Sequence, residues 1–211
     1  MMKKLSKLSL LSAAKAFLVA VFPACSDDDD DGNNFNLVDD GKDNVPSTGG
    51  SLVYNFDDIT EISDKAGATP VLDGKVVVHQ TAAGKIRITA NSDGSHHYIQ
   101  ASCGGSSEMN PANANTTGYL AVKAAKAGEE EIIFTFTTVK GSEASNNSII
   151  LYDALNGKKI GSSDAIACPT SDDNTEKTLK IKATVPETFY VTFVRSAGKG
   201  GFKFSKIEQK Y

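Results

Sequence analysis

The sequence predicts an all-β fold, an antiparallel β-sandwich of the jelly-roll kind, for residues 51–211. Three observations predict this fold class. The chain contains 18 glycines and 6 prolines, it shows no long helical periodicity, and it repeats short runs in which apolar and polar side chains alternate. Many short strands with turn residues between them and no crossover helices are typical of sandwiches and jelly rolls.

Alternation and turn residues place the individual strands. Phe202 and Phe204, for example, alternate with polar neighbours and are expected to face the core. Asn156-Gly157 is a strong hairpin signal and predicts a tight turn after 149–155. Strands are expected at residues 51–56, 75–79, 84–90, 96–101, 118–123, 130–138, 147–152, 176–183, 188–195 and 201–208.

Charge divides the chain into three parts. Residues 1–24 carry four lysines and no acid, residues 26–50 carry eight aspartates and one lysine, and residues 51–211 carry 18 acids and 17 bases. The middle part offers few apolar groups to bury, so we expect an acidic, flexible tether over 25–50. The module that follows has a net charge of −1 and lacks the basic stripe of a nucleic-acid-binding protein.

The first 24 residues predict a secretory signal peptide, because a cationic start and an apolar core end just before Cys25. A cysteine at this position predicts a lipoprotein with Cys25 as its acylated first residue. The alternative, a membrane-spanning helix over 8–24, is interrupted by a lysine and is short for a span of roughly 20 residues. Ser26 and the five aspartates after it resemble the export signal of Bacteroidota lipoproteins, which implies the outer surface of the outer membrane.

The two remaining cysteines, Cys103 and Cys168, present two alternatives. Export makes a disulfide between them possible, and closing so long a loop would contribute on the order of 4 kcal/mol in the chain-entropy model. Otherwise they are two unpaired thiols too far apart to meet. The sequence leaves both possibilities open, because it does not supply the geometry.

No catalytic constellation is visible, so we expect a non-catalytic protein without a cofactor. The histidines are His79, His96 and His97, and the adjacent pair would point to opposite faces of a strand and could not share one metal. The chain has neither a Gly-x-Ser-x-Gly nor a His-Glu-x-x-His motif. Its paired acids are neighbours, which does not predict two carboxylates held across a cleft. A hydrolase or lyase with an unrecognised site is an alternative.

A structural calcium ion is the one metal that the sequence suggests. Asp57 and Asp58 follow the first strand and could supply oxygen ligands, which calcium prefers. The alternative is a solvated strand end.

Sugar binding requires aromatic faces and a few polar groups that fix hydroxyls. The chain has no tryptophan, which weakens this hypothesis, and its tyrosines could equally be half-buried packing. Arg195 precedes a glycine-rich turn, where its planar fork could bind a carboxylate-bearing sugar or be an ordinary edge charge. The candidate aromatic platforms are Tyr98, Tyr119, Tyr152 and Tyr190, with His97 as a further candidate ligand-binding residue.

Several short motifs of the module occur in a recognisable order. They are Tyr54-Asn55-Phe56-Asp57, Leu151-Tyr152-Asp153, Asn156-Gly157, Ile160-Gly161, Val185-Pro186 before Tyr190, and Arg195-Ser196-Ala197-Gly198 before Ile207. In this order the chain resembles the β-sandwich modules appended to pectate lyases and related polysaccharide-degrading proteins of Bacteroidota. The resemblance covers roughly 51–211 and is clearest over 147–208. It implies a carbohydrate-binding function, with Tyr152, Tyr190 and Arg195 at pattern positions.

The sequence therefore predicts an outer-surface lipoprotein whose sandwich binds polysaccharide as a non-catalytic accessory. Its expected partners are a polysaccharide, the outer membrane through the lipid, and neighbouring glycan-degrading or transport proteins. The alternative is a structural or protein-interaction module of a cell-surface complex. A groove lined by aromatic side chains would favour the first hypothesis, and an exposed apolar patch would favour the second.

Overall fold

The computed structural model describes residues 49–211 except 61, 64, 82–85, 103–110, 114–117 and 198–199. The predicted lipid-attachment residue Cys25 and the cysteine Cys103 lie outside the described residues. Residues Pro46–Tyr211 form one compact unit with a large core cluster of its own, and such a unit is expected to fold independently. Among the described residues, no helix has the length and apolarity needed to cross a membrane.

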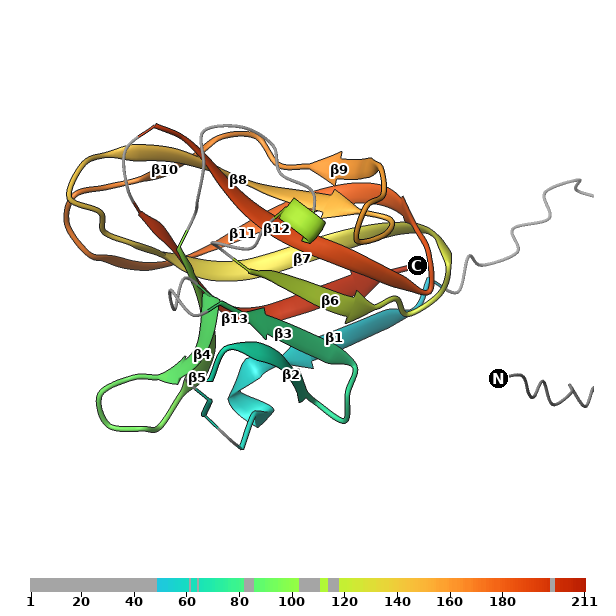
Figure 1. Ribbon diagram of the computed structural model, residues 1–211, viewed down its shortest axis with the longest axis horizontal. Helices are drawn as coiled ribbons and strands as arrows, with labels where there is room; N and C mark the ends of the chain where they lie inside the picture. Colours follow the sequence, from blue (N-terminus) through green and yellow to red (C-terminus); the bar gives the residue numbers. More distant parts are fainter. Residues whose placement is uncertain are drawn as a thin grey trace, which may run out of the picture. The chain divides into compact units, whose positions relative to one another are not determined.

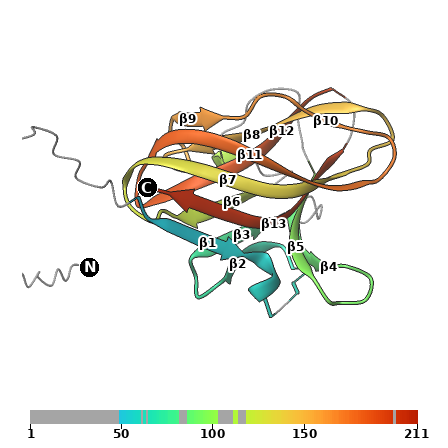
Figure 2. The ribbon, with the colours of Figure 1, turned by 180° about the vertical axis from the view of Figure 1, so that it is seen from behind.

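The fold is a sandwich of two antiparallel sheets, as predicted. Figure 1 shows sheet B in front and Figure 2, from behind, shows sheet A. In order across sheet A lie β11 (Asp173–Val185), β7 (Gly128–Val139), β13 (Gly201–Lys210), β5 (His97–Ser102) and β4 (Ile86–Ala90), with β1 (Ser51–Asn55) also paired to β13. In order across sheet B lie β10 (Ile166–Cys168), β8 (Ser145–Tyr152), β12 (Thr188–Ala197), β6 (Tyr119–Lys123), β3 (Val76–Gln80) and β2 (Gly67–Val71), with β9 (Lys159–Ser162) also paired to β8.

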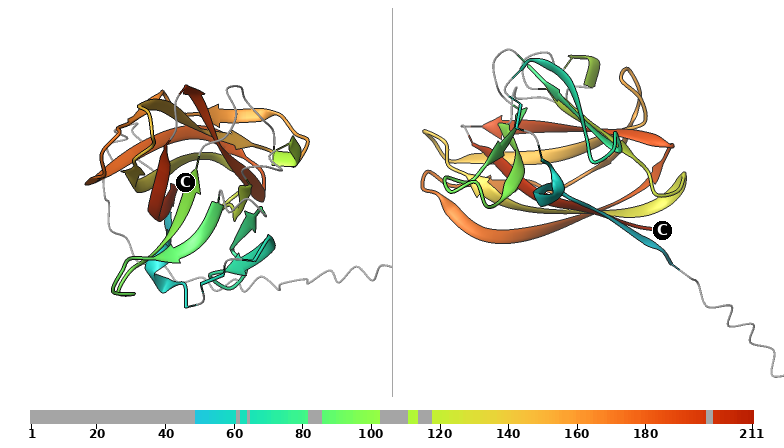
Figure 3. Two further views of the ribbon diagram at one scale, coloured as in Figure 1. Left: turned by 60° about the vertical axis from the view of Figure 1, so that its left-hand side comes forward. Right: turned by 90° about the horizontal axis from the view of Figure 1, so that it is seen from below.

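The two ends of the described unit lie together. The Gly50 amide donates to the Tyr211 carbonyl at 2.7 Å, and the Tyr211 amide donates to the Gly50 carbonyl at 3.1 Å. The right-hand view of Figure 3 shows β1 leading away from the C-terminal end of β13, with which it pairs from Ser51 to Asn55. The chain therefore enters the sandwich at the end where it also finishes.

A cluster of phenylalanines joins the two sheets. The ring of Phe204 on β13 lies with its centroid 5.1–5.8 Å from those of Phe134, Phe136, Phe193 and Phe202. Phe193 belongs to β12 of sheet B, so this contact crosses the sandwich. Each fully buried phenylalanine contributes roughly 1.5–3 kcal/mol of hydrophobic stabilisation. The alternation that predicted Phe202 and Phe204 in the core is confirmed, since both are fully buried.

All ten predicted segments are strands, with ends that differ by a few residues, but three further strands were not predicted. The missed strands β2, β9 and β10 are three to five residues long and lie at the margins of sheet B. Strand β2 also contains Pro70, which argues against a strand in sequence but is tolerated at a sheet edge. Their few apolar residues give too little alternation to detect.

The predicted hairpin at Asn156-Gly157 exists, but its loop is longer than expected. Strand β8 ends at Tyr152, as predicted, but β9 pairs back on it only from Lys159, so residues 153–158 form the loop in place of a tight turn. Asp153 closes the loop because its amide donates to the Lys158 carbonyl at 3.1 Å and its Oδ1 accepts from the Lys158 amide at 2.7 Å. This side-chain hydrogen bond competes with the strand ladder and favours the wider loop.

Two small 3-10 helices complete the described elements, η1 (Phe56–Asp58) and η2 (Pro111–Asn113). Phe56 of η1 is fully buried, so this turn is pinned to the core at the end of β1. Helix η2 is tied to the β8–β9 loop, because the Ala112 amide donates to the Leu155 carbonyl at 2.9 Å.

Buried polar side chains fasten the turn between β6 and β7 to the end of the sandwich. Tyr54 Oη donates to the Lys123 carbonyl at 2.9 Å, and Gln209 Nε2 donates to the same carbonyl at 2.9 Å. Gln209 Oε1 accepts from the Ala125 amide at 2.7 Å. The hydrogen bonds satisfy backbone groups that no strand partner reaches.

Glu130 also holds this turn but is only partly satisfied. Its Oε1 accepts from the Lys126 amide at 2.8 Å, whereas its Oε2 is buried without a hydrogen-bond partner among the described residues. Burial raises the pKa of the Glu130 carboxyl group, and the Lys126 N–H acts in the opposite direction. The buried unpaired oxygen makes the ionised form unfavourable in the folded protein.

We expect Glu130→Gln to stabilise the fold at pH 7 by about 1 kcal/mol. Because the folded pKa of Glu130 is raised, its protonated form favours folding below the unfolded pKa, and this contribution is lost as pH rises through the folded pKa. The advantage of the variant should therefore shrink as pH falls from 7 toward 4.5. Urea unfolding across this range measures it, with exposed Glu129→Gln as the matched control. A pH-independent difference would contradict the assignment.

Candidate functional site

An aromatic row crosses the outer face of sheet B. The core residues Val78, Leu120 and Val191 point inward from β3, β6 and β12. Alternation therefore turns their neighbours on the same strands outward. The outward neighbours are His79, Tyr119 and Tyr190, and Tyr152 continues the line on β8; these four residues are called the aromatic row.

The register of the strands brings the four rings side by side. His79 lies opposite Tyr119, and their rings are stacked with centroids 4.5 Å apart and planes 5° apart. The Tyr119 and Tyr190 rings meet edge-on at 5.9 Å, and Tyr190 lies directly opposite Tyr152. Each ring of the stacked pair has one face covered by the other. His79, Tyr119 and Tyr190 keep part of their side-chain surface open to solvent.

The row combines apolar and polar character. His79, Tyr119 and Tyr190 are half-exposed, whereas Tyr152 is buried. Burial raises the pKa of the Tyr119 hydroxyl, and the neighbouring Tyr190 raises it further, so this hydroxyl stays a neutral donor and acceptor. His79 Nδ1 is buried without a hydrogen-bond partner among the described residues. An unmade hydrogen bond of this kind is unfavourable by about 1–3 kcal/mol.

A small apolar cluster extends the row along β8 and β12. Ile150, Tyr152 and Val194 form a buried cluster against which Tyr190 packs. Thr192 lies between the outward Tyr190 and Val194 on β12, and its Oγ1 is buried without a partner in the described part of the chain. In Figure 1, η2 lies in front of β8 and β12, and it contacts β12. One end of the row is therefore more enclosed than the other.

Gly118 sets the position of Tyr119 at the start of β6. Its φ is +82°, a conformation that favours glycine, and a Cβ atom there would collide with the His79 carbonyl and the Ile86 side chain. The close approach of Gly118 to β3 is what lets Tyr119 stack on His79. No other residue type satisfies both conditions.

The predicted ligand-binding residues do not form one site. Tyr152 and Tyr190 lie in the aromatic row, but Tyr98 points from the outer face of sheet A, where Lys203 Nζ lies 5.1 Å from its ring centroid. Arg195 is half-buried opposite Asn147 on β8, five residues along β12 from Tyr190 and beside a β-bulge. Of the predicted residues, Tyr119, Tyr152 and Tyr190 are thus neighbours in the aromatic row. The others, Tyr98, His97 and Arg195, lie elsewhere.

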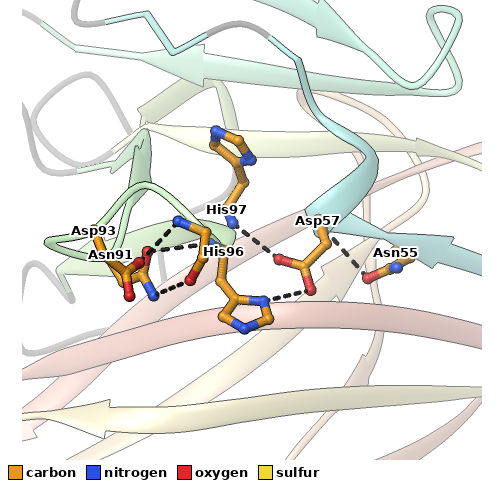
Figure 4. A network of polar contacts seen from close by, with 7 residues as sticks. Asn55, Asp57, Asn91, Asp93, His96 and His97 are labelled. Atoms are coloured by element: carbon orange, nitrogen blue, oxygen red, sulfur yellow. Dashed lines mark hydrogen bonds and ion pairs between the residues drawn. The ribbon is translucent and has the colours of Figure 1, made fainter.

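His97 and Asp57 belong to a separate polar network at the loop before β5. Asp57 Oδ1 accepts from the His97 amide at 2.9 Å, and Asp57 Oδ2 lies 3.1 Å from His96 Nδ1. Figure 4 shows the His96 ring turned toward Asp57 and the His97 ring turned away, as their adjacent positions predict. The His97 contribution to this network is therefore its backbone. Asn91 Oδ1 accepts from the His96 amide at 3.1 Å and supports the same loop.

The network gives Asp57 a structural role that links η1 to β5. Both carboxylate oxygens of Asp57 already contact the loop, and Asn55 Oδ1 accepts from the Asp57 amide at 3.3 Å. Asp58 is exposed. Within the described ranges, no group of three or more His, Cys, Asp or Glu side chains is placed to hold a metal ion. Calcium binding at Asp57 and Asp58 stays a prediction.

Cys168, at the end of β10, is buried and forms no disulfide within the described residues. Its Sγ accepts from Asn147 Nδ2 at 3.0 Å and lies 3.5 Å from the Gly201 carbonyl. Burial raises the pKa of this thiol, with hydrogen bonds from Asn147 and Ser145 acting in the opposite direction. A thiol in this state is a poor nucleophile. The sequence left the pairing of Cys168 with Cys103 open, and it stays untested because Cys103 lies outside the described residues.

His79 is the member of the row that sequence reasoning missed. No binding role is expected for His79 from the sequence, whereas Tyr119 is one of four candidate platforms. The signal was present in the alternation, since His79 and Tyr119 each neighbour a core valine or leucine and so face outward. What the sequence does not contain is the pairing of β3 with β6, which makes the two rings neighbours.

No family model and no curated protein matches this chain. The solved structures similar to it include a xylan-binding CBM22 domain from Paenibacillus barcinonensis, with a TM-score of 0.42 and 13% identity over 75% of this chain and 91% of that one. A family 6 carbohydrate-binding module from Clostridium cellulolyticum, in complex with xylose, has a TM-score of 0.40 and 13% identity over 74% and 94%. The C-terminal CBM6 of a laminarinase from Zobellia galactanivorans has a TM-score of 0.39 and 11% identity over 77% and 100%. Similarity at this level identifies no ligand and no binding residue in this chain.

We expect Gly118→Ala to destabilise the protein by about 2–3 kcal/mol, because the new methyl group overpacks the contact with β3 and the backbone conformation is strained. Urea unfolding measures the change. Gly94→Ala is the matched control, since Gly94 also has a positive φ of +72° but open space around a Cβ atom. Equal losses in the two variants would show that the close approach to His79 is unimportant.

Proposed function

We propose that this protein is a non-catalytic carbohydrate-binding lipoprotein whose glycan site is the aromatic row on sheet B. The observation that carries the proposal is the placement of His79, Tyr119, Tyr190 and Tyr152 on four adjacent strands. Sugar rings present apolar C–H groups and hydroxyls together, and a surface of aromatic carbon edged by hydroxyls complements both. Packing of the hydrophobic core does not explain the row, because the row lies on the outer face of sheet B.

The proposed ligand of the row is a neutral polysaccharide. The row and the apolar cluster beside it contain no acid, lysine or arginine side chain. A charged sugar would lose hydration there without gaining a partner of opposite charge. Adjacent strands are separated by about 4.8 Å, so the four strands of the row span roughly 14 Å of sheet. A polymer can therefore lie across several strands and contact several rings.

The proposal includes a lipid anchor at Cys25, which would hold this module at the outer surface of the outer membrane. A surface module can work with weak sites, because many anchored copies bind one polymer together. This supports glycan capture beside degrading or transport proteins. The weak single site also fits the absence of tryptophan from the chain.

The alternative function, a protein-interaction module, has less support in the described residues. The large apolar side chains exposed there belong to separate segments, namely Val53, Ile62, Leu155 and Tyr211. Scattered apolar side chains are usual on a monomer and do not form the contiguous patch of a protein interface.

We expect Tyr190→Ala to weaken binding of a neutral polysaccharide by about tenfold, because it removes the ring that joins Tyr119 to Tyr152. Affinity gel electrophoresis of residues 26–211 against β-glucan, xylan and galactan measures this. Tyr190→Phe keeps the ring and should bind nearly as well. Tyr98→Ala, on the opposite sheet, is the matched control. Equal loss in Tyr98→Ala, or binding of none of these polymers, would refute the aromatic row as a glycan site.

We expect Cys25→Ala to abolish lipid attachment and to move the protein from the membrane fraction to the soluble fraction. Cysteine is the acylated residue in the proposed lipoprotein, and alanine offers no thiol for the lipid. Metabolic labelling with radioactive palmitate, followed by fractionation, measures both effects. Equal label in the variant would contradict the assignment of Cys25. Cys168→Ala, which removes a buried thiol, is the control and should keep its label.

A further inference from the structure

The outer face of sheet A has a charge that the composition conceals. Residues 51–211 have a net charge of −1, but the side chains that the regular ladders of sheet A turn outward include six bases and three acids. The net charge of this surface is therefore +3. We call it the basic face; its charged residues are Arg87, Lys180, Lys182, Lys203, Lys206, Lys210, Glu129, Glu131 and Glu208.

Two of the three acids of the basic face are already paired, and the third, Glu129, lies at the far end of β7 opposite Thr184. Lys180 Nζ lies 3.2 Å from Glu131, and Lys210 Nζ lies 3.7 Å from Glu208. Four cations remain on the face without an ion pair among the described residues, namely Arg87, Lys182, Lys203 and Lys206. Several unpaired cations on one surface attract an anionic partner.

Two of these cations frame a small polar and aromatic platform. Arg87, Gln100 and Lys203 lie directly opposite one another on β4, β5 and β13. Arg87 Nη2 donates to Gln100 Oε1 at 3.3 Å, and Lys203 Nζ lies 5.1 Å from the centroid of the Tyr98 ring. Three adjacent strands separate the outer members of this row by about 10 Å. The platform combines a planar guanidinium fork, an ammonium group and an aromatic ring.

The surroundings of the platform leave its cations available. Asp172, in the turn before β11, is paired with Lys140 at 3.0 Å. The hydrogen bond from Lys140 holds the pKa of Asp172 low, and Lys203 contributes to the same effect from further away. Arg87 is exposed and Lys203 is half-exposed, so both side chains are accessible to a ligand without rearrangement of the core.

We propose that the basic face is a second glycan site, which binds an acidic polysaccharide bearing carboxylate groups. A guanidinium fork matches the geometry of a carboxylate, and the Tyr98 ring offers apolar contact to the sugar ring that carries it. The aromatic ring beside Lys203 favours a sugar polymer over a phosphate surface, because a phosphate surface needs charge alone. The site is independent of the aromatic row, which lies on the other sheet.

The test compares polygalacturonate with its highly methyl-esterified form, which has the same backbone without the charge. Residues 26–211 should bind polygalacturonate in affinity gels, lose affinity between 50 and 300 mM NaCl as exposed charges are screened, and ignore the esterified polymer. Arg87→Gln combined with Lys203→Gln should weaken binding by about five- to tenfold. Lys158→Gln, an exposed lysine of the β8–β9 loop, is the matched charge control and should bind normally.

Further variants separate this site from the aromatic row. Tyr98→Ala should weaken polygalacturonate binding but not binding of neutral polymers, and Tyr190→Ala should do the reverse. Equal urea midpoints of all variants show that the fold is intact. The proposal is overturned if polygalacturonate is not bound, if the esterified form binds equally, or if Lys158→Gln loses as much as the double variant. Binding to phosphatidylglycerol vesicles without binding to polygalacturonate would assign the face to a membrane surface instead.

Discussion

The contact of Phe204 with Phe193 across the sandwich is the constraint on which both outer faces depend. Phe204 fixes the inward side of β13 and Phe193 that of β12, because their rings fill the space between the sheets. Side chains alternate along a strand, so the inward phenylalanines dictate which residues face outward. Lys203 and Tyr190 are outward for this reason. A shift of β13 by one residue would bury Lys203 and expose Phe204, and the same shift of β12 would bury Tyr190 and expose Phe193.

Much of this arrangement was accessible from the sequence, and the part that was not has a physical cause. Alternation predicted the core face of β13, because a period of two is a local property. The short marginal strands β2, β9 and β10 escaped, since three to five residues carry too little pattern. The aromatic row escaped because it depends on which strands pair. The pairing of β3 with β6 joins His79 to Tyr119 across a separation in sequence that no local pattern spans.

The same reasoning explains why Tyr98 and Tyr190 looked equivalent in sequence and differ in the structure. Both tyrosines follow or precede a core residue on a strand and are half-exposed. Strand β5 belongs to sheet A and β12 to sheet B, so their side chains leave the sandwich on opposite sides. The distribution of charge differs between faces in the same way, since a module with a net charge of −1 has one face with a net charge of +3. The amino-acid composition gives only the total charge and the total number of tyrosines, whereas folding distributes them between two opposite faces.

Magnitudes decide how two such faces act at physiological salt. The Debye length there is about 8 Å, so cations about 10 Å apart on the basic face are partly screened from one another and each contributes modestly. The aromatic row acts through apolar contact, which salt does not screen. In the proposed function, the row therefore supplies the salt-resistant part of binding, and the basic face selects carboxylates and raises the association rate. Neither proposed contribution is large for one module, so the proposal attributes polymer capture to many copies that bind one polysaccharide chain.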